Sequence, residues 1–170
     1  NVTVKNSPLP KFIDKDGNKL DIENGDYISC NTIIIGDGVT ATLVKDGENI
    51  DPTSELEEGK YTITLVDEDG ISGTIEFTID RTAPVISGIS KLPIIKKAQT
   101  FVFENFDDVD TAILIKNGET INLLATGVLT KNEDGKYQYT VDKNGAYSLQ
   151  VKDKAGNQTT ISFTIKGLAE

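Results

Sequence analysis

One stretch of 22 residues occurs twice in this chain of 170 residues, and the repetition limits the folds that the chain can adopt. The stretch GKYTITLVDEDGISGTIEFTID begins at Gly59, and the stretch GAYSLQVKDKAGNQTTISFTIK begins at Gly145. The two are identical at nine of 22 positions without a gap, at a constant offset of 86 residues. A repeat of this length predicts two copies of one structural unit.

Apolar and polar residues alternate within both copies. In the second copy, every second residue of 147–151 is Tyr, Leu or Val, and every second residue of 161–165 is Ile or Phe. A period of two is typical of strands with one buried face. The break between these runs contains Gly156 and Asn157, which tolerate positive φ and close hairpins. Each copy is therefore predicted to form one β-hairpin.

A second repeat lies upstream of the first. TATLVKDGENI, from Thr40, matches TAILIKNGETI, from Thr111, at seven of eleven positions and an offset of 71 residues. The second copy therefore carries 15 more residues between its two repeats, among them KYQYTV at 136–141, which predicts one longer or extra strand. Further strands are predicted at 32–35, 85–89, 101–103, 111–116 and 120–124. No window shows helical spacing of apolar residues, so we expect very little helix.

The number of strands in the second copy predicts the fold. Seven short strands in about 85 residues are typical of an immunoglobulin-like sandwich. Immunoglobulin domains place a Tyr two residues before their second disulfide cysteine. Here Tyr61 precedes Ile63 and Tyr147 precedes Leu149, so an aliphatic residue takes the place of that cysteine. Two interpretations remain open for the tyrosines: a tyrosine corner, or a core residue with its hydroxyl at the rim.

The residues quoted above, together with DRTAPVISG at 80–88, resemble the tandem immunoglobulin-like modules of Gram-positive surface and secreted proteins. In those modules a Tyr-containing strand, an Asp-x-Ala-Gly-Asn hairpin and a final strand ending near Asp-x-Thr-Ala-Pro recur. The first copy departs from the pattern, because DEDGI replaces the hairpin tip and keeps only Gly70. The resemblance covers about 8–167 and implies an all-β fold of two tandem immunoglobulin-like β-sandwich domains. It implies little about function, because such modules do many jobs.

The boundary between the copies is predicted at DRTAPV, because Pro84 cannot donate to a ladder and favours the start of a strand. We expect one domain over 1–80, in which 1–7 is a leading segment, and a second over 81–167. A linker this short and bearing a proline restrains the two domains. The chain begins with Asn1 and contains no Met, so we expect flanking domains of the same polypeptide.

Composition excludes several classes of function. The net charge of −10 comes from 27 acidic and 17 basic residues, which disfavours binding to nucleic acid. No apolar run approaches the roughly 20 residues that cross a bilayer, so no membrane span is expected. The chain has no histidine, and its carboxylate pairs lie in predicted turns, so no catalytic residues are expected. The lone Cys30 cannot form an internal disulfide and is interpreted as a small core residue.

Two acidic stretches are the candidates for a calcium site, the one cofactor that the sequence suggests. Carboxylate and amide oxygens are the ligands that calcium prefers, and the candidate ligands are Asp14, Asp16 and Asn18, and then Glu104, Asp107, Asp108 and Asp110. Neither stretch matches an EF-hand loop, so a solvated turn and a polar loop are the favoured interpretations. Asp67, Asp69 and Asp80 form a weaker set that we expect near the domain junction.

Two hypotheses for function follow. In the first, the domains are non-catalytic spacer (stalk) modules of a bacterial cell-surface or secreted protein and therefore extracellular. In the second, they are an adhesive or carbohydrate-binding accessory module of a secreted enzyme or adhesin, with a glycan or a host protein as partner. Sugar binding uses exposed aromatic rings, and the candidates are Tyr137, Tyr139, Phe103 and Phe106. For the two tyrosines, a place in the core is the favoured interpretation. A cytosolic role is a distant third.

Overall fold

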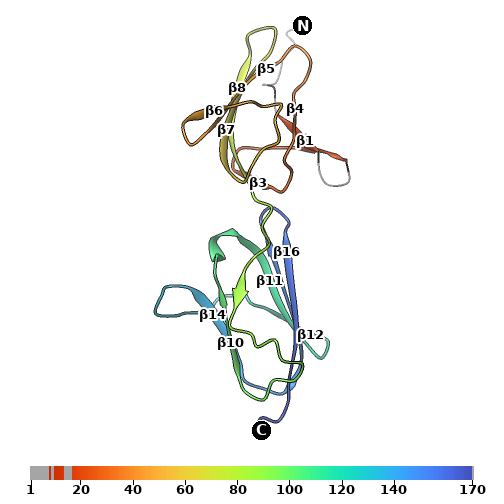
Figure 1. Ribbon diagram of the computed structural model, residues 1–170, viewed down its shortest axis with the longest axis vertical. Helices are drawn as coiled ribbons and strands as arrows, with labels where there is room; N and C mark the ends of the chain where they lie inside the picture. Colours follow the sequence, from red (N-terminus) through yellow and green to blue (C-terminus); the bar gives the residue numbers. More distant parts are fainter. Residues whose placement is uncertain (1–7, 9, 14–16, 170) are drawn as a thin grey trace. The chain divides into compact units, whose positions relative to one another are not determined.

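The structure, a computed structural model, describes residues 8, 10–13 and 17–169. Contacts between Cα atoms divide the chain into two compact units, Asn1–Arg81 and Thr82–Glu170, called here the N-terminal and C-terminal units. Both are built of strands, with Phe106–Asp108 as the single short 3-10 turn among the described residues (Figure 1). The expectation of very little helix is confirmed.

The C-terminal unit contains two four-stranded sheets. The first has the order β12 (Glu119–Asn122), β11 (Val109–Lys116), β15 (Gly145–Asp153) and β16 (Gln158–Ile165). The second has the order β13 (Thr130–Lys131), β14 (Tyr137–Val141), β10 (Gln99–Phe103) and β9 (Ile86–Ser87). Neighbouring strands are antiparallel, and a parallel bridge joins Ile95 to Ile165. The first sheet corresponds to the C′-C-F-G sheet of an immunoglobulin-like sandwich, and the second corresponds to its D-E-B-A sheet.

The N-terminal unit repeats the larger sheet and shortens the other. The larger sheet has the order β3 (Asp26–Ile28), β8 (Ser72–Ile79), β7 (Gly59–Val66), β5 (Thr40–Lys45) and β6 (Glu48–Ile50). The smaller sheet has the order β2 (Lys19–Asp21), β1 (Lys11–Ile13) and β4 (Ile33–Ile34). Strand β3 runs parallel to β8, and the other pairs are antiparallel. The chain is therefore all-β, with two tandem immunoglobulin-like units.

The 15 additional residues of the second copy account for the difference between the smaller sheets. They lie in the segment that contains β13 and β14, and β14 pairs with β10 along four residues. In the N-terminal unit, the strand equivalent to β10 is β4. Its described partner is β1, which lies earlier in the chain. The predicted extra strand is confirmed.

The predicted hairpins β7–β8 and β15–β16 are also confirmed, and their registers agree, with Tyr61 opposite Phe77 and Tyr147 opposite Phe163. The strand predicted at 85–89 is shorter, because Gly88 has a φ of +94° and a Cβ there would lie 2.3 Å from the carbonyl oxygen of Thr100. Bulkier L residues do not adopt this backbone easily, so the strand ends at Ser87.

Two-residue turns set the register of the second repeat. Asp46 and Gly47 have φ values of 52° and 81°, and Asn117 and Gly118 have values of 48° and 89°. Positive φ at both central residues is the type I′ turn, whose twist matches that of the flanking strands. Lys45 therefore faces Glu48 in one unit, and the corresponding residues of the C-terminal unit face each other in the same way.

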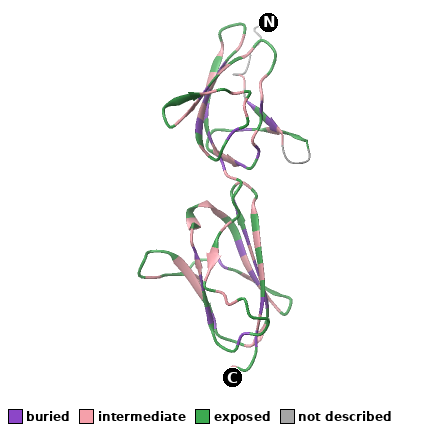
Figure 2. Ribbon diagram, in the orientation of Figure 1, coloured by how far each residue is buried: buried purple, intermediate pink, exposed green. Residues whose placement is uncertain are grey.

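Each unit encloses its own hydrophobic core, built from the inward positions that the alternation predicted (Figure 2). Stacked rings lie in both cores: the centroids of Tyr61 and Phe77 are 5.5 Å apart, and those of Tyr147 and Phe163 are 5.1 Å apart. Cys30 is 6% exposed and belongs to the N-terminal core, as expected. The most buried large side chains are Tyr61, Phe12, Phe77, Phe101, Phe103, Ile22, Leu43, Leu56, Ile63, Ile79, Ile95 and Leu114.

Replacing Phe163 with Ala should destabilise the C-terminal unit by about 3–5 kcal/mol, because the change removes a large buried ring that stacks on Tyr147. Urea unfolding, monitored through the hydrogen exchange of the strand amides, measures this loss of stability separately for each unit. Ser162→Ala, on the exposed face of the same strand, is the matched control. A loss below about 1 kcal/mol would mean that Phe163 does not face the core.

Candidate functional site

The two repeated tyrosines form tyrosine corners. The hydroxyl of Tyr61 donates to the carbonyl oxygen of Glu57 at 2.7 Å, and the hydroxyl of Tyr147 donates to that of Lys143 at 2.8 Å. Both acceptors lie four residues upstream, as in immunoglobulin sandwiches. Ile63 and Leu149, in the place of the disulfide cysteine, are fully buried. Of the two interpretations left open by the sequence, the corner is the correct one.

A lysine ammonium lies over the ring of each corner tyrosine. Lys45 Nζ is 5.6 Å from the ring centroid of Tyr61, and Lys116 Nζ is 5.8 Å from that of Tyr147. Lys45 also donates to the carbonyl oxygen of Glu58 at 2.8 Å. Cation–π contacts of this kind are favourable by about 0.5–1 kcal/mol when exposed. Sequence reasoning missed these lysines, although both occupy the same position of the second repeat.

Burial raises the pKa of the Tyr61 hydroxyl, and the nearby charge of Glu57 raises it further. The hydrogen bond to the Glu57 backbone and the charge of Arg81 oppose this shift. The Arg81 guanidinium is held close by its bond to the carbonyl oxygen of Leu56, at 2.8 Å. The corner of the N-terminal unit is thus a buried neutral phenol in a charged surround.

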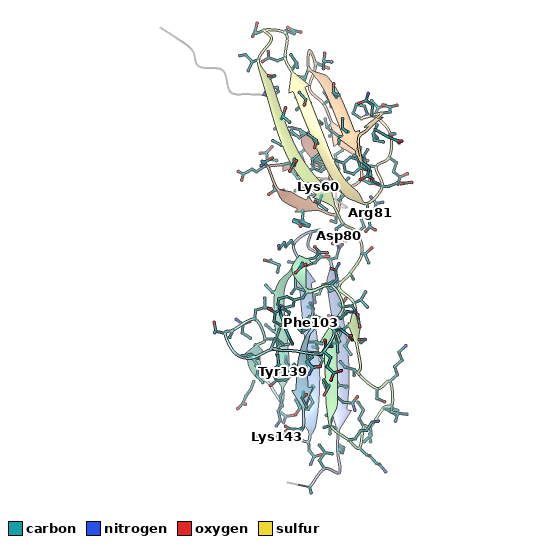
Figure 3. All side chains as sticks on the ribbon, turned by 90° about the vertical axis from the view of Figure 1, so that its left-hand side faces the viewer. Lys60, Asp80, Arg81, Phe103, Tyr139 and Lys143 are labelled. Atoms are coloured by element: carbon teal, nitrogen blue, oxygen red, sulfur yellow. The ribbon has the colours of Figure 1, made fainter. Side chains whose placement is uncertain are left out.

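Three of the four aromatic candidates for sugar binding, Phe103, Phe106 and Tyr137, are joined by ring contacts at the edge of the core, and Tyr139 contacts Phe101 instead. The centroids of Phe106 and Tyr137 are 4.2 Å apart, and those of Phe103 and Phe106 are 5.6 Å apart. Phe103 is buried, whereas Phe106, Tyr137 and Tyr139 are half-buried and pack against the core. Figure 3 labels Phe103 and Tyr139, which belong to the neighbouring strands β10 and β14. The two tyrosines are therefore neither buried core residues nor a fully exposed pair, because both are half-buried and pack against the core.

A hollow of about 220 Å³ beside Phe106 and Tyr137 contains both acidic and basic side chains. Glu104 accepts hydrogen bonds from Lys136 and from the Ser87 hydroxyl. The hydrogen bond from Lys136 lowers the pKa of Glu104 most, and the bond from Ser87 lowers it further. The bond to Glu104 in turn raises the pKa of Lys136. Lys131 Nζ lies 5.0 Å from the Tyr137 ring centroid. These groups bind one another and leave no acid–base pair aimed into the hollow.

The candidate calcium ligands are only partly within the structure. Asp14 and Asp16 lie outside the described residues, and Asn18 is exposed. In the other stretch, Glu104 is paired with Lys136. Asp107 and Asp110 are exposed, and Asp108 is half-buried. Within the described ranges, no three acidic, Cys or His side chains gather where they could hold a metal. Calcium binding by these residues stays a prediction.

The weaker acidic set does not come together. Asp67 and Asp69 lie in the turn before β8, and Asp80 follows its last residue. An eight-residue strand is about 25 Å long, so the two ends are too far apart to share one cation. The expectation that these three meet at the junction is wrong, because a hairpin strand separates them.

The acidic turns have a structural role instead. Asp67 Oδ1 accepts from the backbone N–H groups of Asp69 and Ile71, both at 2.9 Å. In the other copy, Asp153 is 2% exposed and accepts from the backbone N–H and side-chain amide of Asn157, at 2.8 and 2.9 Å. Asn157 does not have the positive φ that the sequence suggested. The Asp-x-Ala-Gly-Asn motif therefore closes the hairpin through its side chains.

Ionisation of Tyr61 should make the N-terminal unit less stable at alkaline pH. Its raised pKa means that the unfolded chain loses the phenolic proton first, so this stability is complete below about pH 10 and is lost as the pH rises through the folded value. Tyr61→Phe should cost about 0.5–1.5 kcal/mol at pH 7 and remove this part of the alkaline loss. Urea unfolding at neutral and alkaline pH measures both effects.

Tyr27→Phe, in strand β3 of the same unit, is the control and should keep the alkaline loss of the parent. An equal alkaline loss in the parent and in Tyr61→Phe would show that the Tyr61 hydroxyl is not buried in the fold.

Comparisons with known proteins give limited similarity. No protein-family model and no curated protein matches the chain. Among the described residues no helix is long and apolar enough to cross a membrane. Solved structures to which the chain is similar include an I-band fragment of titin, with 14% identity and a TM-score of 0.39. The likeness covers 84% of this chain and 62% of the titin fragment.

Two further structures show likeness at the same level. Murine CEACAM1b is 13% identical with a TM-score of 0.34, over 84% of this chain and 96% of that chain. The Bacteroides ovatus mixed-linkage glucan utilization locus protein SGBP-B, solved with a mixed-linkage heptasaccharide, is 18% identical with a TM-score of 0.31. That likeness covers 84% of this chain and 42% of SGBP-B.

Proposed function

We propose that the two units are non-catalytic spacer modules of a bacterial cell-surface or secreted protein, and that they carry tension along the polypeptide. One observation carries the proposal. In each unit the last strand pairs in parallel with a segment from the beginning of the same unit.

The parallel pairing is held by backbone hydrogen bonds in both units. In the N-terminal unit, β3 pairs with the end of β8, and the N–H of Asp80 donates to the carbonyl oxygen of Ile28 at 2.8 Å. In the C-terminal unit, the N–H of Ile95 donates to Thr164 at 2.8 Å, and the N–H of Lys166 donates to Ile95 at 3.0 Å. Each unit therefore joins its last strand directly to a segment from about its first third.

This arrangement resists stretching. When the ends of a unit are pulled apart, two parallel strands slide in opposite directions, and all the hydrogen bonds between them are loaded together. An antiparallel hairpin pulled at its open end breaks its bonds one after another. Resistance to force depends on the rate of unfolding, so loading several bonds at once slows the opening of the unit.

The side-chain chemistry supports a module without catalysis. The full sequence has no histidine, and in the hollow beside Tyr137 the carboxylate of Glu104 is paired with Lys136 while Lys131 lies over the tyrosine ring. The bacterial extracellular setting is supported by the resemblance of Asp80–Pro84 and of the hairpin at Asp153–Asn157 to modules of Gram-positive surface proteins.

A second candidate function is a carbohydrate-binding accessory module. It is favoured by the half-buried rings of Phe106 and Tyr137 at the mouth of the 220 Å³ hollow, since sugars bind over aromatic faces. The ammonium of Lys131 already lies over the Tyr137 ring, which makes this the weaker candidate.

Single-molecule stretching of the chain from its two ends tests the spacer function. We expect two separate unfolding events, each releasing roughly 80 residues, or about 25–30 nm of extended chain. Lys166→Pro removes the N–H that donates to Ile95 and should lower the force of one event only. Ala169→Pro, beyond the last strand, is the control and should leave both forces unchanged.

Opening of both units without measurable resistance would contradict the spacer function. A glycan array tests the second candidate in parallel. Reproducible binding to one polysaccharide, lost in Tyr137→Ala but kept in Tyr27→Phe, would establish the binding module in place of the spacer.

A further inference from the structure

The two units differ completely in net charge, although they share a fold. Residues 1–81 contain 17 acidic and seven basic residues, which gives a net charge of −10. Residues 82–170 contain ten of each and are neutral. The entire net charge of the chain therefore belongs to the N-terminal unit, and this asymmetry is independent of the spacer function.

The basic residues of the C-terminal unit are not evenly spread. No acidic residue occurs from Arg81 to Phe103, and this segment contains KLPIIKK at 91–97, called here the basic loop. Its lysines are all exposed. Leu92 is 63% exposed and Ile94 is 45% exposed, which makes them two of the four large hydrophobic side chains exposed in the described part of the chain.

The basic loop lies at the end of the unit from which the chain leaves (Figure 1). Ile95, its one buried residue, pairs with Ile165 at the end of β16, next to the exposed Lys166. A hollow of about 570 Å³ opens beside the loop, and its lining is mixed, with apolar Leu92, Ile115 and Phe163 and polar Lys91, Asn117 and Thr164 among others. This end of the unit thus combines a hollow of mixed lining with the exposed apolar side chains of Leu92 and Ile94.

The lysines around this surface form no ion pair among the described residues: none of the pairs involves Lys91, Lys96, Lys97 or Lys166. An apolar centre with a charged rim is the anatomy of a protein–protein interface. A partner that fits must present an apolar side chain surrounded by carboxylates.

The N-terminal unit presents such a surface at the turn between β7 and β8. Val66 is 36% exposed and is followed by Asp67, whose Oδ1 is bound within the turn, and by the exposed Glu68 and Asp69. The Glu68 carboxylate reaches the neighbouring loop of Asp37, since its Oε1 would lie 2.3 Å from a Cβ on Gly38. Residues 34–44 and 62–74, which form this end of the unit, contain no Lys or Arg. Residues 36–39 and 66–71 are called here the acidic tip.

We propose that the basic loop of one copy of this chain binds the acidic tip of a second copy. The charges are opposite, and each surface has exposed apolar side chains at its centre, Leu92 and Ile94 on one side and Val66 on the other. The contact joins two different surfaces, so a pair of copies keeps one free surface of each kind and can add further copies head to tail, as an open chain or a closed ring.

The strength of this contact depends on salt. Exposed charges attract one another over roughly 8–10 Å at physiological ionic strength and over longer distances in dilute salt. The apolar centre is small, so the contact belongs to the weak, transient class of interfaces. Electrostatic pairing then provides the specificity for one partner surface.

Sedimentation velocity over a range of protein concentrations tests the proposal at about 20 and 300 mM NaCl. The mean mass of the whole chain should rise with concentration at low salt and return to that of a single chain at high salt. Lys96→Glu with Lys97→Glu should weaken self-association by about tenfold or more. Lys19→Glu with Lys152→Glu makes the same change of charge at exposed positions elsewhere and should weaken it much less.

Exchange of charges provides a second arm. Asp37→Lys with Glu68→Lys should also weaken self-association, because it changes the net charge of the acidic tip from −4 to zero. Mixed with Lys96→Glu/Lys97→Glu, which keeps the acidic tip unchanged, it should form mixed pairs at low salt through its own unchanged basic loop. Circular dichroism of each variant verifies that the strands are retained, as expected for exposed side chains.

The proposal is overturned if the chain stays monomeric at low salt, if Lys96→Glu/Lys97→Glu associates like the parent, or if the mixture fails to assemble. Vesicles of phosphatidylcholine with phosphatidylglycerol are a further probe. A chain that stays monomeric but sediments with these vesicles, and loses this in Lys96→Glu/Lys97→Glu, would have a lipid-binding loop instead.

Discussion

The hydrogen bond from a buried tyrosine hydroxyl to a carbonyl oxygen four residues upstream is the interaction on which each sandwich depends. At Tyr61 and at Tyr147 it connects the start of a central strand to the loop before it. The same ring stacks on a phenylalanine of the last strand and lies under a lysine ammonium. One side chain therefore joins the loop, two strands of the larger sheet and the core. The buried Ile63 and Leu149, two residues further along the same strands, occupy the place of the disulfide cysteine that many sandwiches of this class contain.

The two units use this shared frame with different surroundings. The corner carbonyl belongs to Glu57 in one unit and to Lys143 in the other, and the units as a whole carry net charges of −10 and zero. The 15 additional residues of the second copy contribute β13 and β14 without altering the larger sheet. The two units thus share residues at their core positions. Their exposed positions differ in charge and are available for contacts with other molecules.

Much of the fold could be predicted because strands with one buried face leave a period-two pattern in the sequence. The hairpins and the extra strand near Tyr139 follow from that pattern, whereas it leaves the role of the two repeated tyrosines open. Local geometry could not be predicted: the strand ends before Gly88, whose positive φ and close approach to the carbonyl oxygen of Thr100 depend on the neighbouring strand. The candidate site was harder still. The lysines over the tyrosine rings are positioned by a turn, and Asp80 is separated from Asp67 by the length of a strand, which a list of acidic residues does not reveal.

The hydroxyl protons of Tyr61 and Tyr147 provide the most direct measurement of the central claim. In an NMR spectrum at low temperature, a phenolic proton that is buried and bound to a carbonyl oxygen exchanges slowly with water and gives its own signal. The account predicts two such signals, one with contacts to the backbone near Glu57 and the other with contacts near Lys143. Each should disappear in the corresponding Tyr→Phe variant while the other remains. Phenolic protons of both residues that exchange freely with water would contradict the account.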